Sequence, residues 1–181
     1  NPASYTGVFT SIREFFGTSS EAAEAGASPA DFSFNSGKGR CPHCAGTGWE
    51  HVEMQFLSDV YLPCPICRGR RWQDWILAVR PELDDGVRRS IDEVLDLTVE
   101  EAAAAFANHP AIIKSLSLLS LTGLGYLKLG QPLSTLSGGE RQRLKLAARI
   151  AEGIPQKHRR SDAAWNGPLF VFDEPKIGRA H

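Results

Sequence analysis

The sequence has no long hydrophobic run and no excess of charge. No stretch of about 18 consecutive apolar residues occurs, so we expect no membrane-spanning helix. The first residues, Asn1 to Thr6, lack the basic segment followed by an apolar segment that marks a secretory signal. The net charge of -1 argues against a protein that binds polyanions over its whole surface. We therefore predict a cytoplasmic protein whose basic patches are local.

A second absence concerns phosphate binding. The sequence contains no Gly-x-x-x-x-Gly-Lys-Ser/Thr loop, which cradles nucleotide phosphates in P-loop proteins. At 181 residues with 42% hydrophobic residues, the chain can form one domain, or one domain with a small insert. Any role in nucleotide chemistry must therefore depend on other motifs.

Cysteine is scarce, and its placement is informative. The chain has only four cysteines, in two Cys-x-x-Cys pairs separated by nineteen residues: Cys41, Cys44, Cys64 and Cys67. This spacing lets each pair offer two thiolates to one tetrahedral Zn²⁺. The glycine two residues past each pair suits a turn that aims backbone N–H groups at sulfur. Two disulfides are the alternative, but a chain without a secretory signal points to a reducing compartment. We predict a structural zinc site, with His43 and His51 outside its ligand set.

The segment between the two pairs predicts a hairpin. Residues 49–56 alternate between polar and apolar side chains, which is typical of a half-buried strand. Ser58 and Asp59 suit a turn before the apolar residues Val60 to Leu62. Closed at its base by zinc, this hairpin either presents a face to a partner or packs on the core.

The remaining pattern is mainly helical. Thr98-Val-Glu-Glu101 has the form of a capping box that opens a helix. Pro110 suits the start of another helix, with Ile112, Ile113, Leu116 and Leu119 on one stripe and Gly123 at its end. Asp31 to Phe34 alternates and predicts a short strand.

Leu136-Ser-Gly-Gly-Glu-Arg-Gln-Arg143 also has the form of a capping box. Ser137 would be the N-cap, and Glu140 follows three residues later. Gly138 and Gly139 lack side chains, so their N–H groups can approach an anion closely. The motif therefore predicts a helix N-terminus that binds phosphate.

Leu169-Phe-Val-Phe-Asp-Glu-Pro175 is an apolar run that ends in two carboxylates. It predicts a buried parallel strand. Open α/β sheets bind ligands at the carboxyl ends of such strands. We therefore expect an α/β fold with Asp173 and Glu174 at a ligand site.

In this order and spacing, the last two motifs resemble the signature motif and the Walker B strand of ABC-type ATPases. Zinc pairs upstream of the signature make the resemblance more specific. Over roughly residues 1–175, the chain is similar to the second ATPase half of the UvrA family. The similar stretches include Asn1-Pro-Ala-Ser-Tyr-Thr-Gly-Val-Phe-Thr10 and Gly125-Tyr-Leu-Lys-Leu-Gly-Gln131. The resemblance implies an ABC-type ATPase half with a helical signature subdomain and an inserted zinc hairpin.

The resemblance also implies site roles. The four residues Ser137, Gly138, Gly139 and Glu140 would contact ATP held by a different nucleotide-binding half. Asp173 would orient Mg²⁺ through water, and Glu174 would activate the attacking water. These residue types fit phosphoryl transfer, which depends on positioning and charge stabilisation, and fit Mg²⁺, which keeps most of its waters.

The implied function is recognition of damaged double-stranded DNA in bacterial nucleotide excision repair. ATP binding and hydrolysis would accompany transfer of the lesion to UvrB, by a cytoplasmic homodimer without membrane association. Two alternatives stay open. One is a UvrA-like paralogue in drug tolerance or self-resistance. The other is a zinc-hairpin binding module with vestigial ATPase parts, against which the intact signature and the acidic pair argue.

The chain departs from the family pattern at two points. The missing Walker A loop belongs upstream of Asn1 in that pattern, so we interpret the chain as a fragment that does not hydrolyse ATP alone. Ile177-Gly-Arg-Ala-His181 matches one reading frame of a common sequencing adapter, so we predict a non-native tail and exclude His181 as a switch histidine. The predicted units are 1–40, the zinc hairpin 41–72, the helical subdomain 73–135, the signature and Walker B segment 136–175, and the tail 176–181.

Overall fold

The computed structural model describes residues 1–53 and 60–153 of the chain. Within these ranges the chain forms eight α-helices, one 3-10 helix and one antiparallel pair of strands. Their bounds in chain order are α1 Pro2–Tyr5, α2 Val8–Gly17, α3 Ser20–Glu24, β1 Trp49–Val52, β2 Val60–Pro63, α4 Asp74–Leu77, α5 Ile91–Asp96, α6 Val99–Ala105, α7 Pro110–Leu121, η1 Leu133–Thr135 and α8 Gly138–Gly153. The predicted Walker B strand, with Asp173 and Glu174, and the tail lie outside the described residues.

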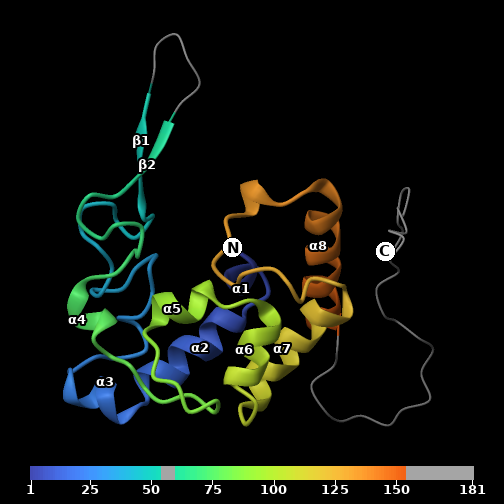
Figure 1. The fold of residues 1–181 in the computed structure, drawn as a ribbon, viewed down its shortest axis with the longest axis horizontal. Helices are drawn as coiled ribbons and strands as arrows, with labels where there is room; N and C mark the ends of the chain where they lie inside the picture. The colour runs from blue at the N-terminus through green and yellow to red at the C-terminus, as the bar shows by residue number, and fades with distance from the viewer. Residues whose placement is uncertain (54–59, 154–181) are drawn as a thin grey trace.

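Helix α7 lies beside α6 and α8 (Figure 1) and packs against α2, α6 and α8. Its stripe residues Ile112, Leu116 and Leu119 are buried, while Ile113 is only half-buried. Removing such side chains from water drives folding, at about 1.5–3 kcal/mol for each large aliphatic residue. The predicted helix from Pro110 is therefore confirmed. No helix among the described residues is long and apolar enough to cross a membrane.

Three helices begin with capping boxes. In each box, the side chain of the N-cap residue and the side chain three residues later each accept a hydrogen bond from the other residue's backbone N–H. In α6 the N–H of Thr98 donates to Glu101 Oε2 at 2.8 Å, and the N–H of Glu101 donates to Thr98 Oγ1 at 3.2 Å. This box was predicted from the sequence. Helix α5 has another box, formed by Ser90 and Glu93. The box of α8 belongs to the candidate site.

The predicted strand over Asp31–Phe34 is wrong. The segment forms turns, in which the N–H and the hydroxyl of Ser28 donate to Asp31 Oδ2 at 3.0 and 2.7 Å. Phe32 is buried and Phe34 is half-buried, and the ring of Phe34 packs against Phe9 at a centroid distance of 4.9 Å. The alternation therefore reflects two rings that face the core, not pairing with another strand.

Strands β1 and β2 form the predicted hairpin, with Trp49 opposite Pro63 and Val52 opposite Val60. The predicted half-buried apolar face is wrong in its described part, because Val52 is 39% exposed, while Met54 and Phe56 lie outside the described residues. The hairpin projects away from the helical body (Figure 1), and Tyr61 and Leu62 are 64% and 49% exposed. Among the described residues, no second layer packs on either face of the two strands. The turn predicted at residues 58–59 lies outside the described residues.

Candidate zinc hairpin and signature loop

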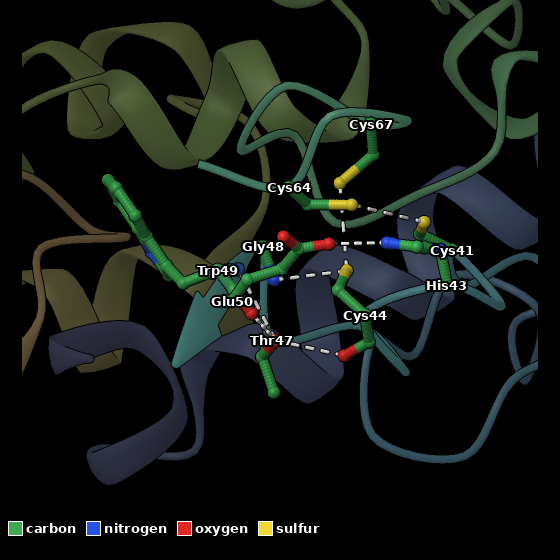
Figure 2. Close-up of polar contacts among 9 residues, drawn as sticks. All are labelled: Cys41, His43, Cys44, Thr47, Gly48, Trp49, Glu50, Cys64 and Cys67. Carbon is green, nitrogen blue, oxygen red and sulfur yellow. Dashed lines mark hydrogen bonds and ion pairs between the residues drawn. The ribbon is translucent and has the colours of Figure 1, made fainter. Parts of the chain in front are cut away.

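The four cysteine side chains converge at the base of the hairpin (Figure 2). Their sulfur atoms all lie within 4.8 Å of one another, with Cys41 to Cys64 at 3.9 Å and Cys44 to Cys67 at 3.7 Å. A tetrahedron with Zn–S bonds of about 2.3 Å has edges of about 3.8 Å. A disulfide would bring two sulfurs to about 2.05 Å, and all four cysteines are free. The donor set and its geometry fit a tetrahedral divalent metal, as the sequence spacing predicted.

Each Cys-x-x-Cys pair is followed by the same backbone turn. Ala45 and Arg68 have φ values of 51° and 52°, and the glycines after them, Gly46 and Gly69, have φ values of 84° and 86°. Side-chain-bearing residues rarely adopt this left-handed region, which costs about 1–2 kcal/mol per residue. The two halves of the site are therefore repeats of one structural unit, which the sequence repeat Cys-Pro-x-Cys-x-Gly indicates.

Backbone N–H groups donate to one sulfur in each half. Gly48 donates to Cys44 Sγ at 3.3 Å, and Arg71 donates to Cys67 Sγ at 3.4 Å. Both donors lie four residues past their cysteine. The sequence predicted that the glycine two residues past each pair would allow a turn that aims backbone N–H groups at sulfur, and both turns do so.

The two halves also bond to each other. The N–H of Cys64 donates to the carbonyl of Gly48 at 2.9 Å, and the N–H of Cys41 donates to the carbonyl of Arg71 at 2.8 Å. The end of each turn therefore fixes the start of the opposite turn. This exchange closes the base of the hairpin.

The environments of the thiols differ. Burial opposes ionisation of Cys44, but donors on Gly48 and Gly46 outweigh it and lower the pKa of this thiol to about 7. Burial raises the pKa of Cys67 to about 12, and the neighbouring Cys44 adds to this shift. Neighbouring thiolates repel one another, so without a cation some of the four cysteines keep their protons. A metal ion that binds here needs thiolates as ligands, and its binding therefore releases these protons.

The two histidines near the hairpin have other contacts. The Nε2 atom of His43 pairs with Oε1 of Glu50 (Figure 2). The ring of His51 stacks on Tyr61 at a centroid distance of 5.0 Å and an interplanar angle of 25°. Neither ring belongs to the four-cysteine cluster.

An aromatic cluster joins the hairpin base to the helical body. Trp72 is buried and donates from Nε1 to the carbonyl of Phe32 at 3.1 Å. Its ring packs edge-on against Phe34, with centroids 5.6 Å apart, and the guanidinium of Arg71 lies 5.1 Å from the Phe34 ring centre. The base therefore has a rigid foundation, while the strands above it stay exposed.

The signature loop has the predicted capping box. The N–H of Ser137 donates to Glu140 Oε2 at 2.6 Å, and the N–H of Glu140 donates to Ser137 Oγ at 3.3 Å. Gly138 and Gly139 are exposed, and a Cβ atom built on either would meet no atom within 4 Å. The N-terminus of α8 is therefore open to an approaching anion, with the positive end of the helix dipole behind it.

Two residues that the sequence did not single out contact this loop. Tyr126 donates its hydroxyl to Glu140 Oε1 at 2.5 Å, and Arg143 donates to the Tyr126 oxygen at 3.4 Å. The hydrogen bond from Tyr126 is the main cause that lowers the pKa of Glu140, and bonds from Ser137 add to it. Tyr126 lies outside the eight-residue motif, so periodicity alone could not find it.

In Figure 1 the hairpin base lies at the upper left of the helical body and the N-terminus of α8 lies at its upper right. A cleft of about 300 Å³ lies between the hairpin base and the loop that leads to the signature. Its lining includes cations, carboxylates and aromatic rings: Trp49, Arg70, Arg71, Trp72, Asp92, Asp96 and Lys128. Arg70 and Asp74 form an ion pair at 2.8 Å, so part of the positive charge here is already compensated.

Comparison with known proteins identifies relatives along almost the whole chain, although no family model matches. UvrABC system protein A of Methanothermobacter thermautotrophicus is 49% identical over 178 residues, which are 98% of this chain and 17% of that protein. The same protein of Thermus thermophilus is 45% identical over 98% of this chain and 17% of its own length. The chain thus spans about one sixth of the relatives it matches.

A solved structure agrees with these matches. The crystal structure of UvrA2 from Deinococcus radiodurans superposes with a TM-score of 0.77 and 46% sequence identity. The match covers 84% of this chain and 18% of that one. The sequence and the fold therefore indicate the same relatives. This chain belongs to the UvrA family and matches one segment of these longer relatives.

Proposed function

We propose that this chain is the zinc-hairpin and signature segment of a longer UvrA-type ATPase that recognises damaged double-stranded DNA in nucleotide excision repair. That protein binds and hydrolyses ATP, acts as a homodimer and transfers the lesion to UvrB. One observation carries the proposal. A single helical body bears both a closed four-cysteine base with an exposed aromatic hairpin and an open signature loop. Identity of 49% and 45% to UvrABC system protein A supports it.

The cysteines Cys41, Cys44, Cys64 and Cys67 would hold a structural Zn²⁺. The metal neutralises the thiolates and joins the two halves of the base, so its contribution is to folding and rigidity. The sulfur separations of 3.7 and 3.9 Å and the two N–H donors to sulfur support this assignment. The chain itself supplies the rest of the base through the exchanged backbone bonds.

The hairpin is the surface that we assign to DNA. Trp49, Tyr61 and Leu62 are 41%, 64% and 49% exposed and lie on two paired strands. Exposed apolar side chains that gather in one place mark interaction surfaces, whereas scattered ones do not. Aromatic and aliphatic side chains can stack on or insert between bases, and a damaged duplex unstacks at a lower cost. Arg68 at the base is exposed and available to phosphates.

The signature loop is the surface that we assign to ATP. The hydroxyl of Ser137 and the N–H groups of Gly138 and Gly139 would contact the phosphates of a nucleotide bound by another half, while Glu140 holds the N–H of Ser137 and so fixes the loop. Asp173 and Glu174 keep the Mg²⁺ and water roles that the family resemblance gives them.

The test measures the affinity of the full-length protein for a short duplex with or without one bulky adduct, in the presence of ATP. The salt concentration is kept fixed because phosphate contacts make affinity strongly salt-dependent. We expect tighter binding to the adduct and transfer to UvrB. Equal binding to both duplexes would contradict lesion recognition.

A second candidate is a UvrA-like paralogue with a role in drug tolerance or self-resistance. The specific support is the structural match to a protein titled UvrA2. The same experiment separates the two candidates, because preference for the adduct without transfer to UvrB would favour the paralogue.

A further inference from the structure

A hydrogen-bonded cluster of Tyr126, Glu140 and Arg143 lies at the N-terminus of α8; we call it the signature clasp. Both oxygens of Glu140 accept hydrogen bonds, Oε2 from the N–H of Ser137 at 2.6 Å and Oε1 from the Tyr126 hydroxyl at 2.5 Å. The carboxylate therefore joins the first residue of the loop to a side chain that comes from another segment, eleven residues before Ser137.

Arg143 attaches the clasp to the helical body. Its Nη1 atom donates to the carbonyls of Gly123 at 3.0 Å and Thr122 at 3.5 Å, and its Nη2 atom donates to the Tyr126 oxygen at 3.4 Å. Those carbonyls lie at the C-terminal end of α7, where a cation is favoured. The clasp thus connects the signature loop to a helix that packs against α2, α6 and α8.

The chemistry of the clasp explains why a carboxylate stands at position 140. Its partners Ser137 N–H and Tyr126 O–H both donate, and a carboxylate accepts at both oxygens. A glutamine would present its NH₂ group either to the N–H of Ser137, which cannot accept, or to the Tyr126 oxygen, to which Arg143 already donates. Tyr126 is 55% exposed, so its side chain contributes little to core packing. Its main interaction is the hydrogen bond from its hydroxyl to Glu140.

We propose that Tyr126 is a positioning residue that holds Glu140 so that the hydroxyl of Ser137 and the N–H groups of Gly138 and Gly139 keep the orientation needed for phosphate. This inference rests on the proposed ATP-binding role of the signature loop. Fixed donors stabilise charge on a transferring phosphoryl group without reorganising during the reaction. Loss of the clasp therefore affects the rate of hydrolysis, while ATP binding by the other half is retained.

The experiment compares Tyr126→Phe with Tyr5→Phe in the full-length protein. Tyr5 lies on α1 and is 43% exposed, so the control removes a similarly exposed hydroxyl from a residue outside the clasp. We expect Tyr126→Phe to lower kcat for the site that this signature completes about tenfold, the size expected when a hydrogen bond to a charged group is lost. KM for ATP and the unfolding temperature should match those of the control.

The pH profile supplies a readout that a purely structural role would not change. The pKa of Glu140 is lowered chiefly by Tyr126, so removal of the hydroxyl raises it. The acid limb of the kcat profile should therefore move to higher pH in Tyr126→Phe. Adding Glu140→Gln to Tyr126→Phe should cost less than the product of the two single effects, because both changes break the same bond.

A Gly139→Asp variant distinguishes failure of this proposal from failure of the proposed function. A carboxylate at this position repels phosphate, so hydrolysis should be lost if the loop contacts ATP. Loss in Gly139→Asp together with normal kcat and an unshifted pH profile in Tyr126→Phe would overturn the clasp. Normal hydrolysis in Gly139→Asp would overturn the role of the loop itself, and the positioning role with it.

Discussion

Gly46 offers a sharp test of how the hairpin base is attached to the helical body. A Cβ atom at this position would lie 1.8 Å from the carbonyl oxygen of Phe34, and real Cβ contacts essentially never fall below 3.0 Å. The Phe34 backbone would therefore have to move by about 1.2 Å, the difference between these two distances. We predict that Gly46→Ala strongly destabilises the base.

Gly69 is the matched control, because it occupies the equivalent position in the second half of the base. Its φ of 86° is almost the same as the 84° of Gly46, and a Cβ atom there would meet no atom within 4 Å. Both alanine variants therefore pay the same backbone cost, about 1–2 kcal/mol. Only Gly46→Ala adds steric overlap.

The size of the added cost follows from what surrounds Phe34. Its ring packs on Phe9 at 4.9 Å and on Trp72 at 5.6 Å, so displacement of its backbone disturbs a packed aromatic cluster. Overpacking of this kind costs roughly 1–3 kcal/mol. We expect Gly46→Ala to lower the free energy of unfolding by about 2 kcal/mol more than Gly69→Ala.

Urea unfolding of the 181-residue chain, followed by tryptophan fluorescence, measures the free energy of each variant. A chelator competition then measures how well each variant retains zinc. A difference of about 2 kcal/mol corresponds to roughly a 30-fold change in the unfolded fraction. Equal destabilisation by the two substitutions, or a larger effect of Gly69→Ala, would refute the packing argument.

Three further predictions concern the metal, the hairpin and the helix caps. Cys64→Ser should abolish zinc retention, measured by elemental analysis, and lower stability, because structural zinc contributes folding energy directly; unchanged metal content would refute the ligand assignment. Tyr61→Ala should change the free energy of unfolding by less than about 0.5 kcal/mol, since the side chain is 64% exposed, but should weaken binding to adduct-bearing duplex by about 1–3 kcal/mol in a titration at fixed salt. Donors on Thr98 lower the pKa of Glu101, and Tyr126 with Ser137 does the same for Glu140. These carboxylates therefore stabilise the fold above pH 4.5, and their contribution is lost as the pH falls through their lower native pKa values. The urea midpoint should fall over this acid range, and less so in Thr98→Ala.

Local sequence signals identified the parts of the candidate site that depend on neighbouring residues. The Cys-x-x-Cys spacing predicted the convergence of Cys41, Cys44, Cys64 and Cys67, because each pair needs only one tight turn to bring two thiols together. The capping box at Ser137 was predicted for a similar reason, since N-cap and N3 residues meet whenever a helix begins there. The Walker B strand, with Asp173 and Glu174, stays a prediction.

Predictions from the sequence were wrong where burial or strand pairing depended on segments far away along the chain. Alternation in the hairpin predicted a half-buried face, but burial of a face requires a second layer, and no described segment covers Tyr61 or Leu62. The segment from Asp31 to Phe34 alternates as well. Its Phe34 ring packs on Phe9 and Trp72 and its Phe32 ring on Phe16, and its backbone pairs with no strand among the described residues.

The sequence by itself therefore determined the chemistry of this protein: which residues can bind a metal, where helices begin and which loop can approach phosphate. These properties follow from residue types at short separations along the chain. Only the tertiary structure decided that the hairpin stands free, that Phe34 closes on Gly46, and that Tyr126 and Arg143 hold Glu140. Each of these outcomes depends on how separate segments pack together. For the signature clasp, α8 packs against α7, and Arg143 donates to the carbonyls of Thr122 and Gly123 at the end of α7.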